Sequence, residues 1–78
     1  MVNTSPITVY SKPACVQCKA TEHYLKKAEL EYQKIDVTEN PEAQEYVTSL
    51  GYTGVPVVVA GEDHWYGFSP DRIQGLID

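Results

Sequence analysis

The chain has 78 residues, enough for one domain with a modest core over residues 1–78 but not for a separate substrate-binding domain. Its formal net charge of -5 at pH 7 argues against nucleic acid as a partner, and its 42% hydrophobic content argues against disorder. The sequence holds no apolar run of bilayer-spanning length, so we expect no membrane partner. Residues 1–6 lack the basic and apolar regions of an export signal, which predicts a cytoplasmic protein.

The first predicted elements flank the chain's two cysteines. Residues 6–10 are rich in β-branched side chains and predict a strand, and residues 11–14 form a loop whose proline suits a turn into a helix. A helix is expected over residues 15–28. Its buried face is predicted to comprise Cys18, Thr21, Leu25 and Ala28, with Tyr24 beside it.

A second strand and helix are predicted in the middle of the chain. The strand covers residues 31–37, whose second half alternates apolar and charged side chains. Asn40 and Pro41 form a helix-start signal, as N-cap and first helical residue, and Gly51 is the expected stop. The apolar stripe of this helix is Ala43, Tyr46, Val47 and Leu50.

The last third of the chain predicts a hairpin and a helix. The all-apolar run over residues 57–60 is typical of a central strand that is covered on both faces. A tight turn at residues 61–62 leads to a returning strand over residues 63–66. Ser69 and Pro70 then begin the last helix, as cap and first-turn proline. Its expected apolar face is Ile73, Leu76 and Ile77.

Together these elements follow the order β-α-β-α-β-β-α, which defines an α/β fold. Connection rules make the first βαβ unit parallel and right-handed, and the last two strands form an antiparallel hairpin. Helices on both faces of the sheet are expected, because the all-apolar strand needs cover on both sides. The sequence contains no internal repeat, linker or low-complexity segment.

Cys15-Val16-Gln17-Cys18 is the motif that carries chemistry. A strand, then two cysteines separated by two residues, then a helix is the order of a thiol–disulfide redox site. The ring closed by such a disulfide is tight, so we expect it to be easier to reduce than a relaxed structural bridge.

The helix position assigns different roles to the two cysteines. Cys15 is expected at the positive helix end, near unpaired main-chain N–H groups that lower the pKa of its thiol and make it the attacking group. Cys18 is expected to be more buried and to stay a thiol until it resolves the mixed disulfide.

Two other interpretations of the cysteines are less favoured. A structural zinc site usually needs four Cys/His ligands in paired motifs, and His23 and His64 show no such pairing. The other interpretation is a pair of buried cysteines that act as small hydrophobic residues. Lys12 either adds positive charge beside the site or is a solvated loop cation, and the sequence leaves both open.

Three segments of the chain resemble the NrdH-redoxins. They are Lys12-Pro13-Ala14-Cys15-Val16-Gln17-Cys18, Pro56-Val57-Val58-Val59-Ala60-Gly61 and Trp65-Tyr66-Gly67-Phe68-Ser69-Pro70-Asp71. The resemblance covers nearly the whole chain and implies the thioredoxin/glutaredoxin fold, with a four-stranded mixed sheet and helices on both faces. The chain departs from the family at Tyr66, where a small residue is common, and at Ser69, where arginine is common.

The resemblance implies a dithiol–disulfide oxidoreductase that is glutaredoxin-like in sequence and thioredoxin-like in activity. Such a protein takes electrons from NADPH through thioredoxin reductase and passes them to the large subunit of class Ib ribonucleotide reductase. We expect a monomer with no bound cofactor or metal, whose only redox group is the Cys15–Cys18 disulfide.

A partner-binding surface around the disulfide is also implied by the resemblance. Its expected residues are Lys12, Val16, Gln17, Val55, Pro56, Trp65, Gly67 and Phe68. Pro56 is expected to be cis, so that the main chain of Val55 can hydrogen-bond to an extended peptide. The alternative is an ordinary trans proline at a strand start. Trp65 and Phe68 are either core residues or part of a docking patch.

Two alternative functions are a glutathione-dependent glutaredoxin and an iron–sulfur-binding glutaredoxin module. Glutathione would bind at the start of the last helix, where Pro70 lacks an N–H donor and Tyr66 and Phe68 are bulky. Asp71 keeps one partner available for the glutathione ammonium group. The second cysteine and the missing glutathione motif argue against the iron–sulfur module.

Overall fold

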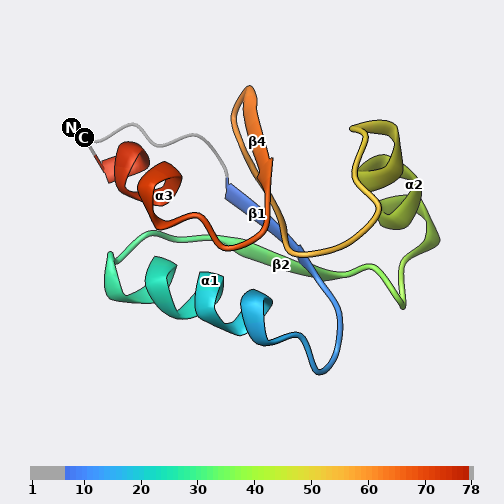
Figure 1. Ribbon diagram of the computed structural model, residues 1–78, viewed down its shortest axis with the longest axis horizontal. Helices are drawn as coiled ribbons and strands as arrows, with labels where there is room; N and C mark the ends of the chain where they lie inside the picture. The colour runs from blue at the N-terminus through green and yellow to red at the C-terminus, as the bar shows by residue number, and fades with distance from the viewer. Residues whose placement is uncertain (1–6, 78) are drawn as a thin grey trace.

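The computed structural model describes residues 7–77 and follows the expected element order (Figure 1). The strands are β1 (Ile7–Ser11), β2 (Gln33–Asp36), β3 (Val57–Ala60) and β4 (Asp63–Tyr66). The helices are α1 (Val16–Lys27), α2 (Pro41–Ser49) and α3 (Pro70–Ile77). The predicted order β-α-β-α-β-β-α is confirmed. Residues 1–6, with the expected strand start at Pro6, and the side chain of Ile77 lie outside the described part.

The strands form one mixed sheet in the order β2-β1-β3-β4. β1 pairs with β2 in parallel, as the connection rule predicts, and the β1–β3 and β3–β4 pairs are antiparallel. β3 is therefore an interior strand, as its all-apolar sequence predicted. Tyr10 lies opposite Val57, and Val57 lies opposite Tyr66. The end of β1, the start of β3 and the end of β4 consequently meet at one edge of the sheet.

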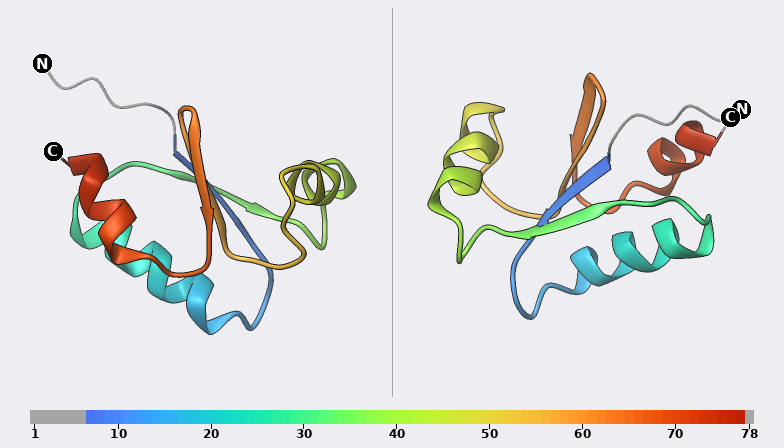
Figure 2. Two further views of the ribbon diagram at one scale, coloured as in Figure 1. Left: turned by 45° about the horizontal axis from the view of Figure 1, so that its top comes forward. Right: turned by 180° about the vertical axis from the view of Figure 1, so that it is seen from behind.

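Successive side chains of β3 point to opposite faces of the sheet, and both faces are covered by helices. All four residues of the strand are therefore apolar. Val58 and Ala60 face the side covered by α1 and α3, whereas Val57 and Val59 face the side covered by α2 (Figure 2). The first core cluster comprises Ile7, Val9, Leu25, Val58, Ala60, Trp65 and Ile73. The second comprises Val37, Ala43, Val47 and Val57. The expected helices on both faces of the sheet are thus confirmed.

β2 is shorter than the strand expected over residues 31–37. Its ladder with β1 runs from Gln33 to Asp36, and Tyr32 packs instead against the first core cluster. β2 is an edge strand, so no second neighbour holds its ends in the ladder.

The first helix ends in a Schellman motif without a glycine. Glu29, two residues beyond the last helical residue, has a left-handed φ of 62°. Its N–H donates to the Lys26 carbonyl and the N–H of Leu30 donates to the Leu25 carbonyl, both at 3.0 Å. The predicted inner face of this helix is confirmed, with Cys18, Thr21 and Leu25 buried and Tyr24 and Ala28 half-buried.

α2 begins and ends at its predicted signals. Asn40 is the N-cap, and its side chain accepts a hydrogen bond from the N–H of Ala43 at 3.1 Å. Pro41 occupies the first helical position, where no N–H is needed. Gly51 follows the C-cap with a left-handed φ of 96° and donates its N–H to Thr48 at 2.9 Å.

Candidate active site

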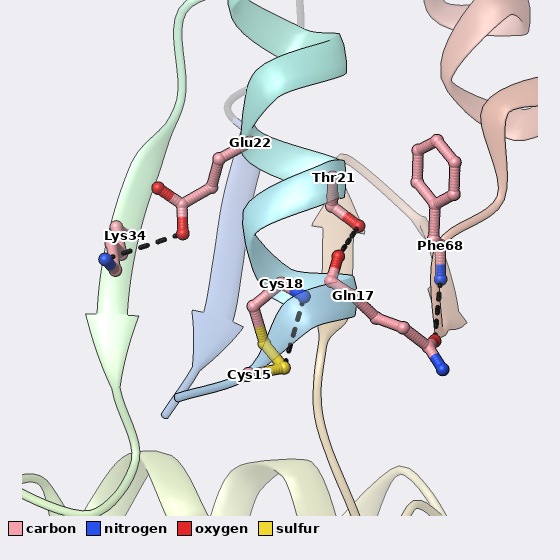
Figure 3. Close-up of a disulfide and its surroundings, with 7 residues drawn as sticks. All are labelled: Cys15, Gln17, Cys18, Thr21, Glu22, Lys34 and Phe68. Carbon is pink, nitrogen blue, oxygen red and sulfur yellow. Dashed lines mark hydrogen bonds and ion pairs between the residues drawn. A yellow bond between two sulfur atoms is a disulfide. The ribbon is translucent and has the colours of Figure 1, made fainter. Parts of the chain in front are cut away.

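The site begins in the loop between β1 and α1. This loop leaves the sheet after Ser11, and Ala14 at its end has a left-handed φ of 59°. The turn places Cys15 at the N-cap of α1. The helix itself begins at Val16, one residue later than expected. Cys15 and Cys18 are joined by a disulfide at the first turn of the helix, with their Cα atoms 5.2 Å apart (Figure 3).

The sulfur of Cys15 takes the position that an oxygen usually holds in an N-cap residue. Cys15 Sγ accepts a hydrogen bond from the main-chain N–H of Cys18 at 3.1 Å, in a buried setting. The first turn of α1 contains no acidic residue that would oppose a negative charge on this sulfur. After reduction, the N–H and the positive helix end favour a thiolate at Cys15 and lower the pKa of its thiol.

The two cysteines differ in how a partner can reach them. Cys15 is 8% exposed and lies at the helix end, where the loop meets solvent. Cys18 is 2% exposed and lies on the inner face of α1 with Thr21 and Leu25. A partner sulfur therefore meets Cys15 first, and Cys18 is placed to attack Cys15 from behind.

Pro56 precedes β3 at the same edge of the sheet, and the Val55–Pro56 bond is cis, as the resemblance implied. The carbonyl of Pro56 accepts the N–H of Gly67 at 2.7 Å, which joins the segment before β3 to the chain leaving β4. Within residues 7–77, the main-chain N–H and carbonyl of Val55 make no hydrogen bond. These groups are free to pair with an extended segment of a partner.

Lys12 lies on the same side of the molecule as Val55. The two residues line one cavity of about 160 Å³, between the loop after β1 and the segment before β3. The other lining residues are Val37, Thr38, Gln44, Val47, Thr53 and Gly54. Lys12 is the one charged side chain of that lining, and in the described part of the chain it forms no salt bridge. This position favours the interpretation of Lys12 as a cation beside the site.

Gln17 connects the motif to the segment before α3. Its side-chain oxygen accepts the main-chain N–H of Phe68 at 3.4 Å (Figure 3). Gly67 has a left-handed φ of 86°, and a Cβ there would lie 3.4 Å from the same oxygen. Phe68 is 39% exposed and packs edge-on against Tyr24, with ring centroids 6.0 Å apart. The expected grouping of Gln17, Gly67 and Phe68 is thus present in the fold.

Trp65 is a core residue, so it offers no ring to a partner. It is 6% exposed and belongs to the first core cluster, and Arg72 covers it with its guanidinium carbon 5.7 Å from the ring centroid. Its assignment to the docking surface needs correction, because successive side chains of β4 point to opposite faces of the sheet and that of Trp65 points to the core. The next residue, Tyr66, turns outward and is 54% exposed.

Tyr66 is therefore the aromatic residue at this edge that sequence reasoning missed as a site residue. The alternation of β4 was the signal that could have found it, since an inward Trp65 forces an outward Tyr66. Other exposed apolar residues at the site are Phe68 and Val16, which is 81% exposed beside Cys15.

Among residues 7–77, no group of three or more His, Cys, Asp or Glu side chains could hold a metal ion. Over the same residues, no helix combines the length and the apolar character needed to cross a membrane.

This chain carries a disulfide at the start of its first helix and a cis-proline before an interior strand. These two features define the thiol–disulfide oxidoreductases of the thioredoxin fold, and the chain is a member of this class. The glutaredoxin family model matches residues 7–65, so the chain belongs to the glutaredoxin family. It is 40% identical over 70 residues to the glutaredoxin-like protein NrdH of Escherichia coli K12, across 90% of this chain and 86% of that protein. The chain is accordingly a glutaredoxin-like redox protein of the NrdH type.

The chain is also similar to a phage protein and to a solved structure. The gene 56 protein of Mycobacterium phage D29 is 40% identical over 78 residues, across 95% of this chain and 84% of that protein. The solved structure of the glutaredoxin-like NrdH-redoxin from Escherichia coli superposes with a TM-score of 0.88 at 39% identity, covering 91% of this chain and 93% of that one. The likeness confirms the thioredoxin/glutaredoxin fold implied by the resemblance.

Proposed function

We propose that this protein is a cytoplasmic electron carrier between thioredoxin reductase and the large subunit of class Ib ribonucleotide reductase. Electrons from NADPH would reach the Cys15–Cys18 disulfide through thioredoxin reductase, and the reduced protein would pass them to a disulfide of the ribonucleotide reductase. The protein would act as a monomer without a bound cofactor. The NrdH type of its relatives supports the partner assignment, and the geometry of the disulfide supports the chemistry.

The transfer of electrons takes two displacement steps. The Cys15 thiolate attacks one sulfur of the substrate disulfide, so that an S–S bond forms to Cys15 and the substrate's other sulfur leaves as a thiolate and takes a proton. The Cys18 thiol then loses its proton and attacks Cys15 Sγ, which releases the second substrate thiol. The substrate has gained two electrons and two protons, and the Cys15–Cys18 disulfide seen in this structure is restored.

The observation that carries the proposal is that the free main chain of Val55 lies at the same edge of the sheet as Cys15, the N-cap residue of α1 and the proposed attacking cysteine. An extended protein segment can hydrogen-bond to the N–H and carbonyl of Val55 while its disulfide lies at Cys15. Val16, beside Cys15, and Phe68, whose main chain is linked to the motif through Gln17, add exposed apolar surface that suits a protein partner. The lone cation of the neighbouring cavity, Lys12, is available to an acidic group of the same segment.

The same geometry disfavours glutathione as the reductant. Glutathione would place a carboxylate at the main-chain N–H groups before α3, but the N–H of Phe68 already donates to Gln17. Pro70, the first residue of α3, has no N–H to offer. Asp71 keeps one partner for the ammonium group, which is too little to hold a flexible tripeptide against its ordering entropy.

A coupled assay tests the proposal by following NADPH oxidation in two parallel systems. One supplies thioredoxin reductase, and the other supplies glutathione with glutathione reductase, each with the same disulfide substrate. We expect turnover with thioredoxin reductase and at least about tenfold slower turnover with glutathione, because only the protein reductant can use the Val55 edge and the apolar surface. Equal rates in the two systems would place the protein among ordinary glutathione-dependent glutaredoxins.

A further inference from the structure

The segment that leads into Pro56 has little main-chain support. Its start is held by the N–H of Tyr52, which donates to the Val47 carbonyl at 3.3 Å. Its end is held by the bond between Gly67 and the Pro56 carbonyl at 2.7 Å. Between these two points, residues 53–55 make no main-chain hydrogen bond within the described chain. Side-chain packing must therefore fix where this segment lies.

β4 supplies that packing from two residues on one face of the strand. The hydroxyl of Tyr52 and Nδ1 of His64 form a hydrogen bond of 2.8 Å, and the two rings meet edge-on with centroids 5.6 Å apart. Tyr66 stacks on the ring of Tyr52 at 6.1 Å with an interplanar angle of 21°. Tyr52 is thus held by both residues, and Tyr66 is the one nearer the site edge of β4.

Tyr66 also lies directly over Gly54. A Cβ on Gly54 would lie 3.3 Å from the Tyr66 hydroxyl oxygen and 3.4 Å from its Cε1, which is tighter than ordinary van der Waals contact. The φ of Gly54 is outside the left-handed region, so its backbone would accept an alanine. An alanine at this position would therefore force the Tyr66 ring to shift by a few tenths of an ångström.

We propose that Tyr66 is a positioning residue for protein substrates. Its ring presses on Gly54 and stacks on Tyr52, and so it holds residues 53–55 where the free N–H and carbonyl of Val55 can pair with a partner segment beside Cys15. This inference rests on the proposed function, because it concerns how the Val55 edge is presented to a protein disulfide.

The role of Tyr66 predicts a difference between two kinds of substrate. A protein disulfide needs both the Val55 edge and the sulfur of Cys15, so it depends on Tyr66. A small uncharged disulfide needs only the sulfur, because it has no extended main chain to pair. Loss of Tyr66 therefore weakens binding of the protein substrate and leaves the chemical step intact.

The first experiment measures insulin reduction and bis(2-hydroxyethyl) disulfide reduction with thioredoxin reductase and NADPH. For Tyr66→Ser we expect KM for insulin to rise about fivefold with kcat within about twofold of wild type, and no change with the small disulfide. Tyr66→Phe keeps the ring and should behave as wild type. Tyr46→Ser is the matched control. Tyr46, in α2, is also exposed, at 41%, but its ring packs against Tyr10 and not against Tyr52 or Gly54.

The second experiment approaches the same contact from Gly54. Gly54→Ala should raise KM for insulin in the wild-type background, because its Cβ displaces the Tyr66 ring. In a Tyr66→Ser background the Cβ has room, so Gly54→Ala should have little further effect, and the two substitutions should be non-additive.

Several results would overturn the inference. An unchanged insulin KM in Tyr66→Ser would do so, as would equal losses with both substrates or additive effects of the two substitutions. A wild-type protein that reduces neither insulin nor the small disulfide with thioredoxin reductase would instead contradict the proposed recycling by that enzyme, and the inference would fall with it.

Discussion

At the residue scale, one main-chain N–H serves both redox states of Cys15. In the disulfide form the N–H of Cys18 caps α1 by donating to Cys15 Sγ. In the reduced form the same donor faces a thiolate, for which a charge-assisted hydrogen bond is stronger. The helix therefore keeps its N-cap throughout the cycle, and the donor that stabilises the helix also activates the nucleophile.

Asp36, at the end of β2, makes a pH-dependent contribution to the stability of the fold. Its carboxylate accepts the hydroxyl of Thr38 at 2.6 Å and the N–H of Thr38 at 2.8 Å. The hydroxyl bond, then the N–H bond and the charge of Lys34, lower the pKa of Asp36 below its ordinary 3.8. A lowered pKa in the folded state stabilises the protein above the ordinary pKa, and this stability is lost as the pH falls through the folded pKa.

Removal of the Thr38 hydroxyl should therefore matter only when Asp36 is ionised. We expect Thr38→Val to lower the free energy of unfolding at pH 7 and the gap to wild type to close as the pH falls below about 3.8. Urea unfolding across this range is the measurement. Thr48→Val is the control, since the Thr48 hydroxyl donates to a main-chain carbonyl and its gap should not depend on pH. A constant gap for Thr38→Val would contradict the account.

At the element scale, elements with local signals could be predicted and those set by distant contacts could not. Asn40, Pro41 and Gly51 carry the start and stop of α2 in their own backbone chemistry, so sequence alone was sufficient. The Cys15–Cys18 motif likewise defined its own helix position. The end of β2, in contrast, depends on which residues of β1 remain available as partners.

The end of α1 near residue 28 was predicted, but the left-handed conformation of the residue after it could not be predicted from its residue type. A left-handed position after a helix is usually glycine, and here it is Glu29, held by the two Schellman hydrogen bonds and by Leu30 against the core. The packing of Tyr66 over Gly54 was missed for a related reason, because it joins residues from different elements.

Glu29→Gly should stabilise the protein by relieving the left-handed conformation. We expect the free energy of unfolding to increase by about 1 kcal/mol in urea denaturation, since a non-glycine residue in this region costs about 1–2 kcal/mol. Glu29→Ala removes the same side chain but keeps the Cβ, so it should show no comparable gain. Equal stability of the two variants would indicate that Glu29 is not strained.

At the scale of the whole molecule, the sheet order explains how separate motifs form one site. Residues 12–18 follow β1, residues 53–56 precede β3 and residues 67–68 follow β4, and the register brings these three strand ends to one edge (Figure 1). Each of the three segments that resemble the NrdH-redoxins includes residues at this edge, which is why the resemblance identified Pro56 and Phe68. Tyr52 and His64 lie outside the recognised segments, so only the fold connects them to the site.

The most direct test of the account is to trap the protein with its substrate. Cys18→Ser should accumulate a mixed disulfide between Cys15 and the large subunit of the class Ib ribonucleotide reductase from the same source, because no thiol remains to resolve it. Non-reducing electrophoresis and peptide mass spectrometry would locate the bond, with Cys15→Ser as the matched control that should form no adduct. An adduct through Cys18 in Cys15→Ser, or none with either variant, would contradict the roles and the substrate assigned to this disulfide.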